Sequence, residues 1–424
     1  MEIQNTNLGN DYKINAQNQK QDKGINLTID KTDKKETEIL NDSLKNQKLK
    51  SGSALAYLNI GLLIGAKLGS EKKDSSDISL KESLIKNFKT FDKNNSGFIT
   101  LSEVKKLISD PNIKGEKAIN LAILSIIMSD KNNEKLSFSD LSKIDTSEPI
   151  FKSQSSNKLL SLEDIKINME NKLKATDKYK KTDGNFQLPK TAKELDFKEV
   201  KQGYLGDCYL LATLSSFTKQ KPESLLKMVK DNNDGTYTVN INGSKIKTPM
   251  PTDTELALGA EGQGIIPIIE KAYALYQNKN SFIESSNPYD KISSGRTTLL
   301  LGKTIKELTG SNYDTDLLEV KTAIGNFNAS SKNETIGKIQ KALKENKLII
   351  ASAQKNNSLN IAGNHAYSVI GFDPKTNSVE IRNPWGKGDA LDLNSEARDG
   401  NNDGIFRISL EEFYKTFNLI SYEK

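Results

Sequence analysis

Cysteine and histidine are almost absent from the sequence, with one residue of each among 424. A single cysteine excludes an internal disulfide framework and any zinc site built on several thiolates. A single histidine excludes every metal site that needs more than one imidazole. The rarity of both residue types makes Cys208 and His365 the first candidates for chemistry.

The chain also lacks a hydrophobic run long enough to cross a bilayer. The most apolar early stretch, residues 54–68, is interrupted by Asn59, by glycines and by Lys67, whereas a spanning helix needs about 20 apolar residues. The first 50 residues are polar and carry no apolar core of a secretory signal. We therefore expect no integral membrane segment, and a location in the cytoplasm or export without a cleavable signal peptide.

Charge of one sign is not in large excess, since 61 basic and 55 acidic residues give a net charge of +6. Nucleic-acid-binding proteins need clustered Lys and Arg, so we expect no nucleic-acid partner. Hydrophobic residues make up only 35% of the chain, and the mean hydropathy of −0.59 is polar for a globular protein. This composition indicates a folded protein with a disordered portion, and it specifies no oligomeric state.

Composition and periodicity divide the chain into five parts. The first lacks periodicity and nearly lacks aromatic residues, so it is expected to be disordered. The expected parts are a disordered segment (1–50), a short helix with a linker (51–80), a helical domain (81–176), a linker (177–190) and a mixed α/β region (191–424). In the last part we expect helices at 208–220 and 266–277 and strands at 347–353, 365–372, 378–383 and 404–408.

Residues 92–103, DKNNSGFITLSE, match the loop of an EF-hand, and helical patterns flank them on both sides. Calcium prefers roughly six to eight oxygen ligands, and Gly97 permits the sharp turn that gathers them. The pattern predicts an EF-hand-like domain that binds calcium, and the alternative is a polar surface turn between two helices. The predicted ligands are Asp92, Asn94, Ser96, the carbonyl oxygen of Phe98 and both carboxylate oxygens of Glu103.

Two degraded copies of this loop follow. Residues 130–140, DKNNEKLSFSD, repeat its start but are one residue short, and residues 153–164, SQSSNKLLSLED, carry Lys158 in place of the glycine. For both we favour a helix–loop–helix unit that binds no metal, with calcium kept as an alternative, chiefly at 130–140. A structural partner for the first loop is expected in either case, because EF-hands usually occur in pairs.

Cys208 stands at the start of a predicted helix whose apolar residues fall on one face. At a helix N-terminus the macrodipole favours the thiolate, which is the nucleophilic form of cysteine. Gln202 lies six residues upstream on the approach loop, where a side-chain amide can donate to a developing oxyanion beside the Cys208 N–H.

His365 and Asn383 lie on two predicted strands joined by the turn DPKTN. An antiparallel hairpin centred on Pro374 places the two residues side by side, so that the Asn carbonyl can hold one imidazole nitrogen. The order of Cys208, His365 and Asn383 and their separations are close to the papain-like pattern, in which His and Asn follow about 130–150 residues after Cys. A lone Cys or His is more often structural, but this arrangement predicts a Cys-His-Asn acyl-transfer site.

These segments resemble the calpain family of papain-like cysteine proteases. QGYLGDCYLLATLSS is similar to the family's Cys motif, GNHAYSVIGF to its His motif and RNPWG to its Asn motif, and the resemblance covers about 190–424. It implies an α+β, papain-like core in which a helical subdomain carrying the Cys faces a β-rich subdomain carrying the His and Asn. The implied roles are Cys208 as nucleophile, His365 as base, Asn383 as its orienting partner, Gln202 as oxyanion donor and Trp385 as a shield for the His–Asn pair.

Two departures from the family pattern bear on function. Tyr209 stands where the family usually has Trp, and Ile405 stands where an acid is expected, so that calcium sites of the protease core rest on Asp389 and Asp403 alone. The predicted function is a calcium-responsive cysteine endopeptidase acting on proteins or peptides. The alternatives are a glutamine deamidase or transglutaminase with the same triad, and an inactive EF-hand adaptor, against which the intact triad argues.

Overall fold

The structure is a computed structural model that forms two compact units, residues 1–56 and 57–424. In the first unit, β1 (Glu2–Gln4) pairs antiparallel with β2 (Lys13–Asn15). The remainder of the segment expected to be disordered, and nearly all of the short helix and linker expected at 51–80, lie outside the described residues. The structure describes residues 2–4, 13–15, 79–130, 133–149, 151–152, 159–297, 300–318, 321–322, 325–326, 331–357, 359–392 and 396–424.

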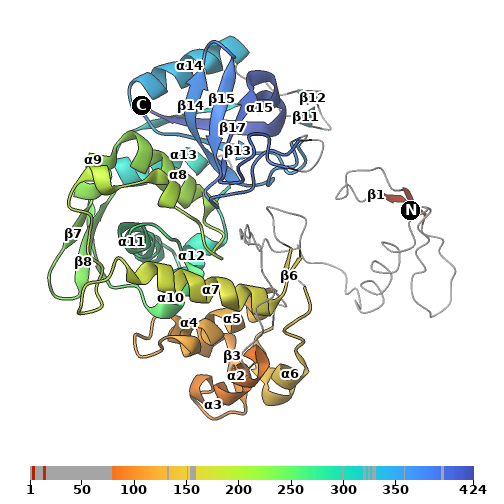
Figure 1. The fold of residues 1–424 in the computed structure, drawn as a ribbon, viewed down its shortest axis with the longest axis vertical. Helices are drawn as coiled ribbons and strands as arrows, with labels where there is room; N and C mark the ends of the chain where they lie inside the picture. The colour runs from red at the N-terminus through yellow and green to blue at the C-terminus, as the bar shows by residue number, and fades with distance from the viewer. Residues whose placement is uncertain are drawn as a thin grey trace. The chain divides into compact units, whose positions relative to one another are not determined.

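The region from residue 79 to 177 is largely helical, and short two-stranded ribbons join its helices (Figure 1). In one ribbon, Ile99 pairs with Leu136 and both side chains are buried. Capping boxes begin many of its helices, as at Thr100 and Ser137. The elements are α2 (Leu80–Lys86), α3 (Phe88–Phe91), β3 (Phe98–Thr100), α4 (Leu101–Ile108), α5 (Glu116–Asp130), β4 (Lys135–Ser137), α6 (Phe138–Lys143), β5 (Phe151–Lys152), β6 (Leu159–Leu160) and α7 (Leu162–Asp177).

A second group of helices packs against a three-stranded antiparallel sheet. Two of them, α8 and α11, occupy the ranges in which the sequence predicts helices. The elements are η1 (Ala192–Glu194), η2 (Phe197–Glu199), α8 (Cys208–Gln220), α9 (Pro222–Lys227), β7 (Val229–Asp231), β8 (Thr236–Ile241), β9 (Ser244–Pro249), α10 (Asp253–Leu258), α11 (Ile265–Lys279), α12 (Asp290–Ser293) and α13 (Leu301–Thr309).

The C-terminal part is built on a six-stranded antiparallel sheet with the order β10-β17-β13-β14-β15-β16. This sheet has its own hydrophobic core, and together with the helices before it forms the α+β architecture expected of the protease core. The elements are β10 (Tyr313–Leu317), β11 (Lys321–Thr322), β12 (Gly325–Asn326), α14 (Lys332–Lys344), β13 (Ile349–Ala353), β14 (Ala366–Asp373), β15 (Ser378–Arg382), β16 (Ile405–Ser409), α15 (Leu410–Thr416) and β17 (Phe417–Glu423).

Helix α8 joins the helical and sheet parts by packing against β14 (Figure 1). The Ser368 hydroxyl donates to the Ala212 carbonyl at 2.6 Å, and the Ile349 N–H donates to the Ser216 hydroxyl at 3.3 Å. These contacts place the helix that begins at Cys208 directly on the strand that follows His365.

The hairpin of β14 and β15 forms as the sequence predicts, but its register is shifted. Ser368 pairs with Arg382 and Phe372 pairs with Val379, with a bulge between Val369 and Gly371, so each residue faces a partner two or three positions later than expected. The turn comprises residues 374–377 and is centred between Lys375 and Thr376 rather than on Pro374, which shifts the pairs next to it by three positions. The bulge adds a residue to β14 and reduces the shift to two positions beyond it. His365 precedes one strand and Asn383 follows the other, so both still lie at the same end of the hairpin.

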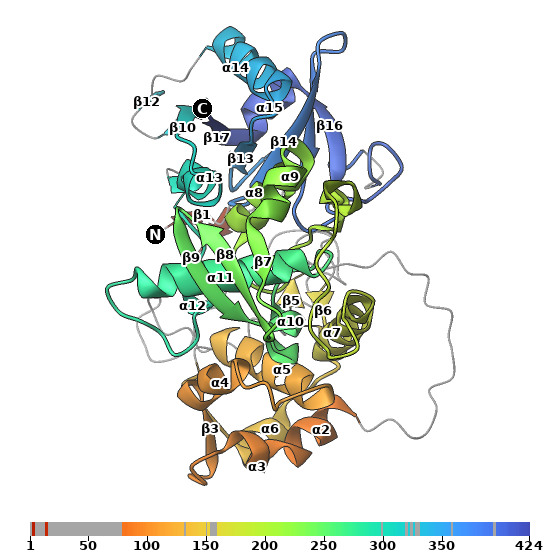
Figure 2. The same ribbon diagram turned by 90° about the vertical axis from the view of Figure 1, so that its left-hand side faces the viewer.

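The region 79–177 packs tightly on the helices of the protease part (Figure 2). The Ser109 hydroxyl donates to Glu255 at 2.7 Å and the Thr252 hydroxyl donates to the Ile108 carbonyl at 2.7 Å. The segment expected as a linker also packs, because Phe186 is fully buried and its carbonyl accepts the Tyr237 hydroxyl at 2.9 Å. Within the described residues, no helix combines the length and apolar character needed to span a bilayer.

Candidate active site

Cys208 is the first residue of α8, and its side chain is buried. Burial raises the pKa of the thiol to about 12, although the N–H groups of Ala366, Tyr209 and Cys208 itself oppose that shift. The helix N-terminus therefore does favour the thiolate, as the sequence suggests, but the loss of water outweighs it. In this conformation the thiol is neutral at pH 7.

His365 is also buried, and Asn383 fixes its tautomer. Its Nε2 lies 2.9 Å from the Asn383 Oδ1, which also accepts the Trp385 N–H at 3.0 Å. The Asn383 Nδ2 donates to the Gly388 carbonyl, so the amide orientation is determined and the imidazole must carry its proton on Nε2. The Nδ1 lone pair is buried without a hydrogen-bond partner, and burial lowers the pKa of His365 to about 3.

Two aromatic rings enclose the imidazole. Trp385 packs along it with ring centroids 4.0 Å apart, and Tyr367 meets it edge-on at 4.9 Å. Both rings are nearly inaccessible to solvent. The sequence motif points to Trp385, whereas Tyr367 was missed, although its place two residues after His365 on an alternating strand could have suggested it.

Cys208 and His365 line the same cavity, which has a volume of about 300 Å³. Asn383 lies behind the imidazole and does not contribute to the cavity wall. The segment 293–297, to which no sequence motif drew attention, also lines the cavity. The lining residues are Gly206, Cys208, Tyr209, Ser293, Ser294, Gly295, Arg296, Thr297, Leu301, Ser352, Asn364, His365 and Ala366.

Gln202 does not line this cavity. Its Nε2 donates to the Leu205 carbonyl at 2.6 Å, and its buried Oε1 has no hydrogen-bond partner. The loop that carries it is held close to its neighbours, since a side chain at Gly203 would collide with the carbonyls of Leu258 and Gly259. The structure thus brings Cys208 and His365 together, while the Gln202 amide is engaged elsewhere.

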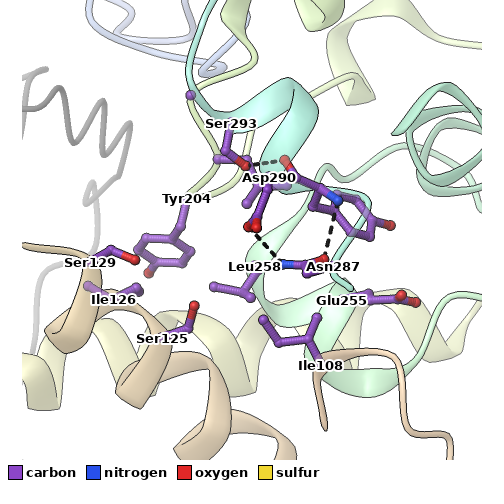
Figure 3. A pocket seen from close by; sticks show the side chains of 13 residues that line it. Ile108, Ser125, Ile126, Ser129, Tyr204, Glu255, Leu258, Asn287, Asp290 and Ser293 are labelled. Atoms are coloured by element: carbon purple, nitrogen blue, oxygen red, sulfur yellow. Dashed lines mark hydrogen bonds between the residues drawn. The ribbon is translucent and has the colours of Figure 1, made fainter. Parts of the chain in front are cut away.

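A smaller cavity of about 150 Å³ lies between the region 79–177 and the turn before Cys208 (Figure 3). Its walls include Ile108 and Ser129 from the N-terminal helices, and Tyr204 and Asp290 from the protease part. Gly206 and Ser293 line both this cavity and the one that contains Cys208. A side chain at Gly206 would collide with the Ser293 carbonyl, so the two cavities share a closely packed wall.

The oxygen atoms of the loop 92–103 gather around its backbone N–H groups. Asp92 accepts from the N–H groups of Ser96 and Gly97 at 3.0 and 2.9 Å. One oxygen of Glu103 accepts from the N–H groups of Lys93 and Asn94, and the other accepts from Thr100 in a capping box. These hydrogen bonds lower the pKa of Glu103 against the effect of burial, so its carboxylate is ionised.

Further oxygens lie close to the Asp92 carboxylate and the Ser96 N–H that it accepts. The Asn94 Oδ1 shares the Ser96 N–H with Asp92, and the Ser96 hydroxyl lies 3.1 Å from the Phe98 carbonyl oxygen. Carboxylate, amide, hydroxyl and carbonyl oxygens on one loop are the donor types that calcium prefers. In the part of the chain that is described, no three or more His, Cys, Asp or Glu side chains form a cluster suited to a metal ion.

Each of the two degraded loops ends on an aspartate that caps a helix. Asp140 and Asp164 cap α6 and α7 through Ser137 and Ser161. Residues 131–132 and 153–158, which complete these loops, lie outside the described residues.

The two acids on which a core calcium site would rest are held by the backbone. Asp389 accepts the Gly404 N–H at 2.6 Å and Asp403 accepts the Ile405 N–H at 2.9 Å. Burial raises the pKa of Asp389 to about 7. This carboxyl is therefore only partly ionised near neutral pH, which makes it a weaker calcium ligand than an exposed aspartate.

The comparison with known families gives one match. The sequence model of a family described as "Calpain family cysteine protease" matches residues 168–422, which is more than half of the chain. The match begins within α7, ends within β17 and includes the three residues of the predicted triad. The comparison with curated proteins gives no match.

Proposed function

The chain belongs to the calpain family of cysteine proteases, and from this premise we propose that Cys208, His365 and Asn383 hydrolyse peptide bonds in protein substrates. The main support is the imidazole, whose Nε2 is held by Asn383 while its Nδ1 lone pair is unused. That nitrogen is the base a nucleophilic thiol requires, and the thiol lines the same cavity.

The reaction proceeds in two acyl transfers. The Nδ1 of His365 takes the thiol proton, and the Cys208 sulfur attacks the substrate carbonyl to form a tetrahedral oxyanion. This intermediate collapses to a thioester as His365 returns the proton to the leaving amine. His365 then takes a proton from water, and the resulting hydroxide hydrolyses the thioester to a carboxylic acid and the free thiol.

Gln202 is proposed to stabilise the oxyanion together with the Cys208 N–H. Its amide now donates one N–H to the Leu205 carbonyl, and because the side chain does not line the cavity, it must turn toward Cys208 before its second N–H can reach the oxyanion. This contact, together with the neutral thiol and imidazole, indicates a resting state in which the nucleophile is not yet ionised. Formation of the thiolate–imidazolium pair then requires a rearrangement or the arrival of substrate.

The resting state predicts slow alkylation of Cys208. At pH 7 iodoacetamide should label the folded protein at least about tenfold more slowly than the urea-unfolded chain, because a raised thiol pKa leaves less thiolate. The rate for the folded protein should rise as the pH rises toward the thiol pKa. The chain's one cysteine makes the unfolded protein an exact reference. Equally fast labelling of folded and unfolded protein at pH 7 would rule out a neutral resting thiol.

The proposed reaction is tested by incubating the protein with an unfolded protein substrate and measuring new chain ends by mass spectrometry. New amino and carboxyl termini are expected. Release of ammonia from glutamine side chains without new termini would instead identify a deamidase or transglutaminase. The absence of both products, with and without calcium, would favour an inactive adaptor.

We also propose that residues 92–103 form an EF-hand-like calcium loop. The oxygen donors would be Asp92, Asn94, Ser96, the Phe98 carbonyl and Glu103. Bound calcium would place a positive charge in the loop, and these oxygens would coordinate it. The pairing of β3 with β4 supports this proposal, because it joins the loop to the degraded copy at 130–140. The copy at 130–140 and the protease core remain secondary candidates for calcium.

A short series of contacts leads from this loop to the active site. Glu103 lies in the first turn of α4, and Lys105 of the same helix forms an ion pair with Asp290 at 2.8 Å. Asp290 begins α12, which ends at Ser293 against Gly206 (Figure 3). A change in the position of α4 would therefore reach the turn that precedes Cys208.

Calcium at millimolar concentration is expected to raise the peptidase activity of the wild type and to do less for Glu103→Gln. That substitution removes a charge and weakens bidentate coordination, and with two carboxylates in the loop the dissociation constant should be roughly 10⁻⁵–10⁻³ M. Calorimetry and initial rates measure the two effects.

Glu82→Gln is the matched control, because Glu82 occupies the same capping-box position at α2 outside the loop. It should bind and respond to calcium as the wild type does. No calcium uptake by the wild type at millimolar concentration would refute the metal site. Equal activation of Glu103→Gln and wild type would move the response to the protease core.

A further inference from the structure

The lining of the active-site cavity includes an arginine. Arg296 lines the cavity together with Cys208 and Tyr209, the residue that follows the nucleophile. Its guanidinium lies over the Tyr209 ring, 4.9 Å from the centroid. Arg296 is the one charged side chain among the described residues that line the cavity. The other lining residues are small, polar or apolar, and His365 is neutral.

The guanidinium is held in place by a buried network. Its Nη1 donates to the Thr304 hydroxyl at 2.9 Å and to Glu307 at 3.0 Å, both on α13, which packs against α8 (Figure 1). Glu307 is in turn fixed by the Tyr273 hydroxyl at 2.5 Å and by Gln277. An arginine restrained in this way loses little rotamer entropy when it binds a further partner.

The network does not neutralise the wall. Glu307 is shared between Arg296 and Lys303, whose Nζ lies 3.6 Å from its other oxygen. Glu307 therefore does not serve Arg296 alone, and the half-exposed Lys303 adds a second positive charge to this network. The contacts with Glu307 and Thr304 use Nη1 alone, so no hydrogen bond to another described residue occupies the Nη2 and Nε donors of Arg296, and these donors can serve a carboxylate.

We propose that Arg296 selects substrates with an aspartate or glutamate side chain close to the scissile bond. This inference rests on the proposed function of Cys208 and His365. A carboxylate that enters the cavity meets a fixed guanidinium at a site with little water, where a charge-assisted hydrogen bond is strong. The corresponding amide, Asn or Gln, has the same shape but lacks the charge.

The test uses peptides that contain one cleavable bond and are capped at both ends, so that no terminal carboxylate competes. Asp, Glu, Asn or Gln is placed in turn at each position around that bond. The measured quantity is the ratio of kcat/KM for the acidic peptide to that for its amide. At one position the wild type should prefer the acid by about tenfold or more, the usual effect of a hydrogen bond to a charged group.

In Arg296→Gln this ratio should fall to about 1–2, and Arg296→Lys should keep part of the preference. The matched control is Arg407→Gln, an exposed arginine paired with Glu380 on the outer strands, which should keep the wild-type ratio. A ratio near 1 at every position in the wild type would overturn the proposal. So would a ratio that survives in Arg296→Gln, even if both rates fall, because Arg296 would then only support the fold. If no peptide is cleaved at all, the proposed function itself is wrong.

Discussion

Replacement of Cys208 by alanine should reduce peptide hydrolysis by about 10⁴–10⁶, which is the usual cost of removing a catalytic nucleophile. No other group in the cavity can form the thioester. The fold should survive, because alanine is smaller than cysteine, favours the helix and leaves the backbone contacts of α8 in place. The measurements are kcat/KM with a fluorogenic peptide and the melting temperature of each variant.

Ser215→Ala is a suitable control for that variant. Ser215 is buried on the same helix, and its hydroxyl makes only a long contact of 3.5 Å with the Phe197 carbonyl. The control therefore removes a buried polar atom from α8 but leaves the thiol, and it should retain most of the activity. Undiminished proteolysis by folded Cys208→Ala would refute the assignment of the nucleophile and, with it, the mechanism.

Loss of His365 should have the second largest effect. Without an imidazole the thiol has no base, so His365→Ala is expected to lose about 10³-fold or more in kcat/KM. Asn383→Ala should lose less, about 10–10²-fold, because the imidazole remains and only its orientation and tautomer are freed. Both variants are compared in kcat/KM at several pH values.

Asn383 should also contribute to stability. Asn383 also accepts the backbone N–H of Trp385 and donates to the Gly388 carbonyl. Its removal therefore leaves two buried donors, on Trp385 and His365, and one carbonyl without a partner, each at a cost of about 1–3 kcal/mol. Asn383→Ala should therefore lower the free energy of unfolding, which denaturant titration measures. If folded Asn383→Ala proves as inactive as His365→Ala, Asn383 contributes more than orientation.

Much of the fold and of the candidate site could be predicted from short sequence patterns. The helix that begins at Cys208 could be placed from its apolar face and the preceding Gly-Asp turn, both encoded within a few residues. The approach of His365 to Asn383 followed from two strands and one turn. Its register did not, because the four-residue turn is centred between Lys375 and Thr376 rather than on Pro374, and because the bulge near Ile370 depends on how the strands twist and pack.

The features that short sequence patterns could not predict depend on tertiary contacts. Arg296 has no motif around it, and it reaches the cavity because α13 packs on α8 and holds it through Glu307. The sequence predicts that Gln202 lies on the approach loop to Cys208, but the contact of its amide with the Leu205 carbonyl depends on the conformation of that loop. Likewise, the polar composition of 177–190 suggested a free linker, whereas one residue within it, Phe186, anchors the segment in the core.

The shared core of the region 79–177 and the protease helices has a thermodynamic consequence. Lys172 of α7 is buried, donates to the Gly259 carbonyl and lies near the buried carboxyls of Asp207 and Glu270. One hydrophobic cluster runs from Leu80 through α5 and α8. The two regions should therefore unfold in a single cooperative transition. By linkage, any ligand that binds the folded loop at 92–103 stabilises the protease as well, in proportion to the logarithm of its concentration once the loop is saturated.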